Sequence, residues 1–85
     1  MENPTRTSEL ETHQVEDGFI IYDPSSAQVH HLNNVAFFIY SLCDGSCPAE
    51  DIVRLVATAY ALDAEPATEV DIALDALRQK GLIAG

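Results

Sequence analysis

Hydrophobic and polar positions alternate in short runs over the first third of the chain. Residues 9–15 (ELETHQV) alternate loosely, residues 19–23 (FIIYD) are aromatic and β-branched, and residues 28–32 (QVHHL) form a third short run. Period-two alternation in such residues predicts three β-strands. The Asp-Gly pair at 17–18 and the segment PSSA at 24–27 have turn chemistry. The pattern therefore predicts a three-stranded antiparallel meander.

The rest of the chain changes to helical spacing, with apolar residues three and four positions apart. One helix is expected between 33 and 45, a second over about 48–60 and a third over about 66–80. Asn33 or Asn34 suits the N-cap of the first helix, and Gly45 suits the left-handed position that ends it.

Each predicted helix has one face that we expect in the core. These faces comprise Val35, Ala36, Phe38, Ile39, Leu42 and Cys43, then Ile52, Leu55, Val56, Ala59 and Tyr60, then Val70, Ala73, Leu74 and Leu77. Phe37, Tyr40 and Ser41 lie opposite the first of these arcs. Tyr40 is nevertheless expected to pack under the sheet.

Three strands followed by three helices predict an α+β domain with segregated elements, similar to a winged helix-turn-helix arrangement. A length of 85 residues suits one domain. Residues 1–8 are polar and include Pro4, so we expect a disordered tail there and a folded domain over 9–85.

Charge restricts the class of partner. Four Lys and Arg residues stand against 14 Asp and Glu residues, which gives a formal net charge of −10. Such a field repels phosphate backbones and anionic membrane surfaces, whereas a basic or apolar partner is tolerated. The chain also has no apolar run of roughly 18 residues and no secretory signal at its start. The expected location is the cytoplasm.

Candidate catalytic and metal sites are sparse. Neighbouring residues on a strand point to opposite sides of the sheet, so His30 and His31 do not converge on one ligand. Cys43 and Cys47 are four positions apart without a second pair of ligands, which is a weak metal signal. No Gly-rich phosphate loop and no paired carboxylates accompany them. The expected protein has no cofactor, no metal and no enzymatic activity.

Ile72 is a different kind of feature. It lies almost opposite the Val70, Leu74 and Leu77 face of the third helix, with Ala76 and Gln79 on its own side. This placement makes Ile72 either a scattered surface residue or one wall of a groove.

A family resemblance covers residues 18–83. The segment VHHLNNVAFFIYSLCDG resembles the L-N-x-x-A-x-x-I-aromatic-x-x-x-D-G signature of PqqD-like proteins. The matching residues are Leu32, Asn33, Ala36, Ile39, Tyr40, Asp44 and Gly45, then Ile52 and Leu55, then Asp71, Ile72, Leu77, Gly81 and Leu82. Leu74 departs from the pattern, because it falls about one position from where the family has its middle leucine.

The resemblance implies a peptide chaperone, or RiPP recognition element, with a winged-helix-like fold. Such proteins bind the leader of a ribosomally made precursor peptide and present it to a modifying enzyme, often a radical SAM enzyme or a leader protease. The leader adds as a strand beside the third strand and packs on the third helix. The implied peptide-binding residues here are Ala27, Gln28, Val29, His30, His31, Leu32, Ile72, Asp75, Ala76 and Gln79. A homodimer through the open strand edge is a further possibility.

Two other functions compete with this hypothesis. A winged helix that binds DNA is disfavoured by a pI near 4.3 and by having only Arg54, Arg78 and Lys80 as cations within the domain. An acidic carrier protein would be a four-helix bundle with an Asp-Ser-Leu attachment site. Here Ser41-Leu42 follows Tyr40 instead, and the first third reads as strands. A general protein-interaction module remains an alternative.

Overall fold

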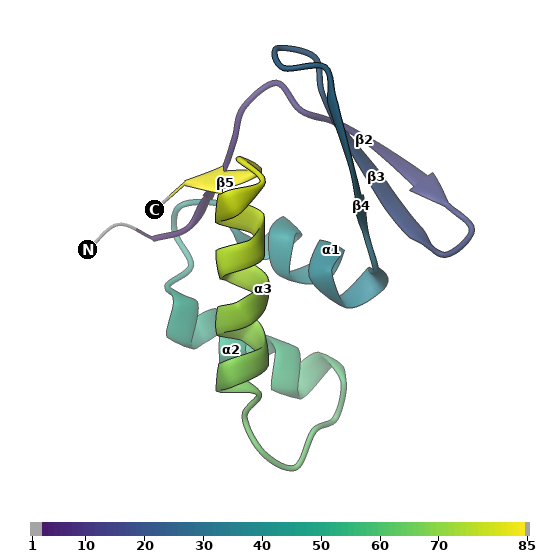
Figure 1. Ribbon diagram of the computed structural model, residues 1–85. Coiled ribbons are helices and arrows are strands. Elements are labelled where there is room, and N and C mark those ends of the chain that lie inside the picture. The colour runs from purple at the N-terminus through teal and green to yellow at the C-terminus, as the bar shows by residue number, and fades with distance from the viewer. Residues whose placement is uncertain (1–2, 85) are drawn as a thin grey trace.

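The computed structural model describes residues 3–84 and shows an α+β domain in which a three-stranded antiparallel sheet precedes three helices (Figure 1). The sheet has the order β2-β3-β4, with bounds Glu11–Val15, Gly18–Asp23 and Gln28–Leu32. The predicted fold class and meander are therefore confirmed. No helix among residues 3–84 is long and apolar enough to cross a membrane.

The first turn differs from the predicted one by one residue. Val15 pairs with Gly18, so Glu16 and Asp17 form the two-residue loop, and Gly18 is already part of β3. Gly18 has φ +151°, and a Cβ added there would lie 2.3 Å from the carbonyl oxygen of Leu32. The glycine is thus required by close backbone approach within the sheet, not by the turn itself.

The second turn sets the start of β4. The carboxylate of Asp23 accepts hydrogen bonds from the backbone N–H and the hydroxyl of Ser25, at 3.0 and 2.7 Å. Ala27 completes the turn with φ +55°, and Asp23 pairs with Gln28 directly after it. The predicted PSSA turn is confirmed, because a side-chain-capped turn returns the chain beside β3.

Helices α1, α2 and α3 span Asn34–Leu42, Ala49–Ala59 and Ala67–Gln79. The side-chain oxygen of Asn33 accepts a 2.8 Å hydrogen bond from the N–H of Ala36, which settles Asn33 as the N-cap of α1. Gly45 follows the end of this helix with φ +85°, the left-handed conformation that the sequence predicts.

One core lies between the sheet and the helices. Its buried apolar residues are Ile21, Leu32, Ile39, Tyr40, Cys43, Ile52, Val53, Val56, Val70, Leu74, Leu77, Leu82 and Ile83. Phe37 packs on the sheet by stacking on Phe19, with ring centroids 3.7 Å apart. The expected burial of Tyr40 is confirmed, and so is the core face of α3.

The predicted core face of α2 is partly wrong. Val53 is buried with Ile52 and Val56, whereas Leu55, Ala59 and Tyr60 are exposed. These three buried residues form one arc that α1 and α3 cover, and Leu55 lies off its edge. In α1, the predicted core residue Val35 is exposed in the first turn. Sequence periodicity locates an apolar arc, but the neighbouring helices decide its centre.

The disordered tail predicted for residues 1–8 is also corrected, except that residues 1 and 2 lie outside the described residues. Strand β1 (Thr5–Arg6) pairs with β5 (Ile83–Ala84) at the C-terminus. On its other side, the N–H of Arg6 donates to the carbonyl of Cys43 at 2.7 Å. Backbone hydrogen bonds, which polar side chains do not reveal in a sequence, hold this segment in place.

Candidate functional site

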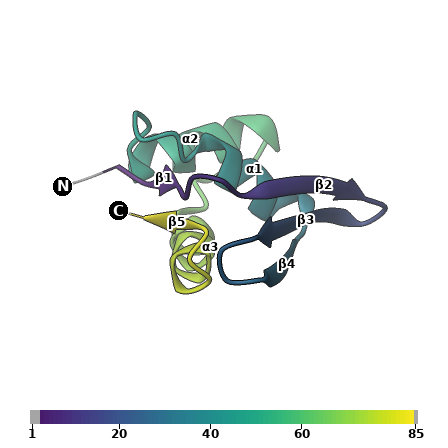
Figure 2. The same ribbon diagram turned by 90° about the horizontal axis from the view of Figure 1, so that it is seen from above.

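Strand β4 has one free edge. It pairs with β3 on one side, and no strand of residues 3–84 pairs with its other side. In both views β4 is the strand of this sheet that lies nearest to α3 (Figures 1 and 2). An edge strand presents unpaired N–H and C=O groups, so a second extended chain can add beside it.

The register decides which side of the sheet each histidine faces. His30 pairs with Ile21, which is fully buried, so its side chain lies on the side of the sheet that faces the helices. His31 pairs with Ile20 on the outer side, where its Nε2 lies 3.3 Å from a carboxylate oxygen of Asp17. His30 is therefore the histidine on the helix-facing side of β4.

The histidines do not form a metal site. His13 and His31 flank Ile20 on the outer side, two strand spacings or roughly 10 Å apart. His13 instead lies 3.7 Å from a carboxylate oxygen of Glu11. Within residues 3–84, no three His, Cys, Asp or Glu side chains are arranged to hold a metal ion.

The cysteines are free thiols with structural surroundings. Cys43 is fully buried, and its Sγ donates to the carbonyl of Ile39 at 3.2 Å. Burial raises the pKa of the Cys43 thiol to about 11, and burial also raises the pKa of the Cys47 thiol. Both groups are therefore protonated near neutral pH, whereas the thiolate is the form that attacks electrophiles and binds metals.

Helix α3 has two flanks that differ in character. On the flank toward α1, Ala73 and Ala76 are half-buried, and Ala73 lines a cavity with Asn33 and Ala36. Ile72 is 64% exposed and lies beside this flank, pointing away from the core as predicted. Ala73 and Ala76 thus give this flank of α3 a surface of small apolar side chains.

The opposite flank carries charge. Asp75 follows Ala73 by two residues, or about 200° around the helix, and accepts a 2.8 Å ion-pair hydrogen bond from Arg78. One turn before, Asp71 lines a surface depression with Val53 and Arg54 of α2. Asp75 nevertheless adjoins Ile72 and Gln79 on the exposed face of α3, because it is three positions after Ile72 and four positions before Gln79.

The remaining predicted site residues are distributed along β4 and at the end of α3. Gln28, Val29 and His31 are exposed, and Gln79 is exposed in the last turn of α3. Leu32 has its side chain in the core, so it can offer only its backbone to a partner. Ala27 belongs to the turn before the strand.

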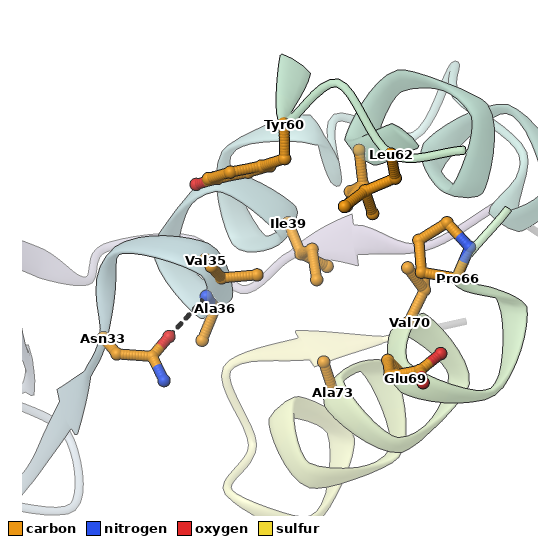
Figure 3. A pocket seen from close by; sticks show the side chains of 11 residues that line it. Asn33, Val35, Ala36, Ile39, Tyr60, Leu62, Pro66, Glu69, Val70 and Ala73 are labelled. Atoms are coloured by element: carbon orange, nitrogen blue, oxygen red, sulfur yellow. Dashed lines mark hydrogen bonds between the residues drawn. The ribbon is translucent and has the colours of Figure 1, made fainter. Parts of the chain in front are cut away.

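Sequence reasoning missed an apolar cavity beside the start of α1 (Figure 3). The cavity has a volume of about 390 Å³ and lies between α1, the end of α2 and the first half of α3. Its lining residues are Asn33, Val35, Ala36, Ile39, Val56, Tyr60, Leu62, Pro66, Glu69, Val70 and Ala73. Helical spacing predicts Val35 and Tyr60 to be core residues. Only their exposure in the folded chain shows that they border an open space.

A free strand edge beside an apolar helix flank defines a class of protein. Proteins that bind an extended peptide by strand addition use such an edge, with main-chain hydrogen bonds supplying affinity and side-chain pockets supplying specificity. The sequence comparisons agree with this class.

The chain belongs to the PqqD family, since the model described as "Coenzyme PQQ synthesis protein D (PqqD)" matches residues 18–83. PqqD is a RiPP recognition element, and membership supports a non-catalytic, peptide-binding role in the biosynthesis of ribosomally made, modified peptides. The match begins at β3, so β1 and β2 lie outside it. Searches of curated proteins and of solved structures returned no match.

Proposed function

We propose that this protein binds the leader segment of a ribosomal precursor peptide by strand addition to β4 and presents it to a modifying enzyme. The observation that carries the proposal is the free edge of β4 next to α3. The leader runs antiparallel to β4, with an apolar side chain over Ile72 and Ala76. The protein catalyses no step itself and works in the cytoplasm beside an enzyme such as a radical SAM protein or a leader protease.

Side-chain positions support this placement. Ile72 is the most exposed of the large apolar residues, and burial by a partner would remove its apolar surface from water. His30 and Gln28 lie on the helix-facing side of β4, where alternate side chains of an added strand would meet them. Asp75 adjoins Ile72 on the exposed face of α3 and pairs with Arg78, so the two charged residues are placed to orient a charged residue of the leader.

The electrostatics favour a peptide over nucleic acid. Arg54 pairs with Asp51, and Arg78 pairs with Asp75, so two of the few cations carried by the helices are already neutralised. With a net charge of −10, little positive surface is left to release counterions from DNA. A winged-helix DNA-binding role is therefore the weaker alternative, and a gel-shift assay with duplex DNA tests it directly.

The test is an NMR titration of the ¹⁵N-labelled chain with synthetic peptides that cover short reading frames beside its gene. We expect amide shifts clustered in residues 27–32 and 68–80 on addition of the correct leader. Shifts centred on α2 around Arg54 would contradict the proposed docking face. Sedimentation of the free chain at increasing concentration shows whether it forms a homodimer.

A further inference from the structure

We propose that a polar pocket on the β2 side of the domain binds a carboxylate on a small aryl or alkyl stem, with the hydroxyl of Tyr40 and the guanidinium of Arg6 as donors. The pocket has a volume of about 410 Å³ and lies between α1 and the segment that joins β1 to β2. Its lining residues are Arg6, Thr7, Glu9, Leu10, Thr12, Phe37, Tyr40 and Ser41. The inference does not depend on the proposed function, because the pocket involves neither β4 nor α3.

The hydroxyl of Tyr40 is a buried polar group without an internal partner. Tyr40 is only 5% exposed, yet its hydroxyl forms no hydrogen bond with any atom of residues 3–84. No fully buried side-chain oxygen or nitrogen in this part of the chain lacks a partner, so the hydroxyl still meets solvent, and the pocket is the space that Tyr40 lines. Because a buried tyrosine hydroxyl usually has a hydrogen-bond partner, this one is available to a ligand.

Arg6 brings a positive charge to the same pocket. Its guanidinium donates to the carbonyl of Ser41 at 2.6 Å and forms no ion pair with a carboxylate of residues 3–84. Arg54 and Arg78, in contrast, each pair with an aspartate. A guanidinium has five N–H donors, so Arg6 keeps donors for a ligand while its bond to Ser41 holds the side chain against α1.

The two donors suit a carboxylate. Burial raises the pKa of the Tyr40 hydroxyl, and the charge of Arg6 counteracts part of this shift. The hydroxyl is therefore protonated near neutral pH and can donate beside a fixed positive charge. A carboxylate has two accepting oxygens, so it can bind both donors at once through charge-assisted hydrogen bonds.

The rest of the lining limits the class of anion. Leu10 and Phe37 are half-buried and give the pocket an apolar wall, which an aryl or alkyl stem would cover. Glu9 also lines the pocket, and the net charge of the chain is −10. Both features repel a doubly charged anion such as phosphate more strongly than a singly charged one. The pocket therefore favours a monocarboxylate with an apolar stem.

The first experiment uses 3-phenylpropionate as the probe and the full ¹⁵N-labelled chain as the receptor. At neutral pH and constant ionic strength, we expect saturable shifts at the amides of Arg6, Thr12, Tyr40 and Ser41. The neutral isostere 3-phenylpropanamide should bind at least tenfold more weakly, because it offers Arg6 no negative charge. Equal binding of acid and amide, or no saturable shift at these amides, would overturn the inference.

A second probe distinguishes a free acid from the C-terminus of a peptide. Acetyl-Gly-Phe carries the same phenyl group and a free carboxylate, but it adds a backbone before them. If it binds at least as tightly as 3-phenylpropionate, the pocket accepts a C-terminal carboxylate. If only 3-phenylpropionate binds, the ligand is a free small acid. Both results support the carboxylate site, and failure of both probes contradicts it.

Matched variants test the hydroxyl of Tyr40. Tyr40→Phe should weaken the binding of 3-phenylpropionate about tenfold, as expected for the loss of a hydrogen bond to a charged group. Its melting temperature should equal that of the parent chain, because the hydroxyl has no partner within residues 3–84. Tyr22→Phe, on the outer side of β3, is the control and should change binding less than twofold.

A second pair of variants tests the charge of Arg6. Arg6→Gln should weaken the binding of 3-phenylpropionate at least tenfold, whereas Arg54→Gln makes the same change in net charge outside the pocket and should change it less than twofold. Parent-like binding in Tyr40→Phe and Arg6→Gln, or equal losses in the control variants, would overturn the carboxylate site. None of these measurements involves a peptide at β4, so such a result would leave the proposed function intact.

Discussion

Strands β1 and β4 of this small domain differ in how many of their two edges are hydrogen-bonded to other parts of the chain. Strand β1 is bonded on both sides: it pairs with β5, and it exchanges backbone hydrogen bonds with the turn after α1 through Arg6 and Gly45. Strand β4, in contrast, pairs on one side only within the described residues. Strand β1 is closed by the chain itself, whereas the meander leaves the outer edges of β2 and β4 unpaired within the described residues, and of these two β4 lies nearer to α3.

This difference shows how a domain with little core area can divide its backbone groups between stability and binding. Each internal hydrogen bond contributes about 0.5–1.5 kcal/mol of net stability, and an unpaired edge gives up that contribution. The side chains near β1 and those of β4 differ in the same sense. Arg6 and Thr7 donate to the carbonyls of Ser41 and Gly81, at 2.6 and 2.7 Å. The residues of β4, apart from Leu32, are exposed or half-buried.

The largest effect is expected from proline in β4. Alternate residues of an edge strand direct their N–H groups to the partner strand and to the free edge, so Val29 and His30 differ in this respect. Proline at the position facing the free edge should cost about 3 kcal/mol or more, which is at least a hundredfold in peptide affinity, at little cost in stability. Proline at the other position should destabilise the fold. Calorimetry with melting curves distinguishes them.

Alanine at the same two positions is the control, because it keeps the backbone donor. His30→Ala should weaken binding much less than the damaging proline does. If both prolines bind the peptide as the parent chain does, β4 is not the docking strand, and the contrast between open and closed edges has no functional meaning.

Removal of residues 1–8 tests the closed edge. Deletion takes away β1 and the hydrogen bonds of Arg6 and Thr7, so the free energy of unfolding should fall by about 2 kcal/mol. Urea denaturation measures this change. Peptide affinity of the folded fraction should stay within twofold, since the deleted segment lies away from β4. An unchanged urea midpoint would show that the terminal strands contribute nothing.

Ile72→Ser tests whether the side chain of Ile72 contacts a peptide bound at the open edge of β4. Burying an isoleucine contributes roughly 1.5–3 kcal/mol, so the substitution should weaken peptide binding about tenfold or more. Folding should hardly change, because Ile72 is exposed in the free chain. Leu55→Ser on α2 is the comparison variant. Equal losses in Ile72→Ser and Leu55→Ser would indicate a nonspecific apolar effect.

Asn33→Ala should give a smaller loss at the junction of β4 and α1. The variant removes the hydrogen bond that caps α1, which typically costs about 1 kcal/mol of stability. Asn33→Asp keeps an accepting oxygen and should restore most of it. Thermal melts of the three proteins measure the difference, and a wild-type melting curve for Asn33→Ala would rule out the cap as a stabilising contact.

The smallest effect, within error of zero, is expected from metal removal. Cys43 and Cys47 are protonated thiols, and the three histidines do not converge. Peptide affinity measured by calorimetry should therefore be the same with and without a chelator. A loss of binding on chelation would show that these side chains hold a metal in the complex.

Local patterns in the sequence were sufficient for the strands β2, β3 and β4 and for the three helices. Strand alternation, turn residues and the Asn33 cap act between residues a few positions apart, so they can be read without the fold. The same holds for the exposure of Ile72, since helical spacing alone places it opposite Val70, Leu74 and Leu77. The family signature rests on the same short-range spacing.

Tertiary structure decided whatever depends on distant neighbours. The pairing of β1 with β5 joins the two ends of the chain through backbone atoms, which residue identity does not encode. The burial of Val53 in place of Leu55 follows from how α2 packs against α1 and α3. The cavity arises because Val35, Tyr60 and Leu62 come from different segments and meet only in the folded chain. Helical spacing predicts which apolar residues share one face of a helix, but only the packing of the elements determines which of those residues are buried.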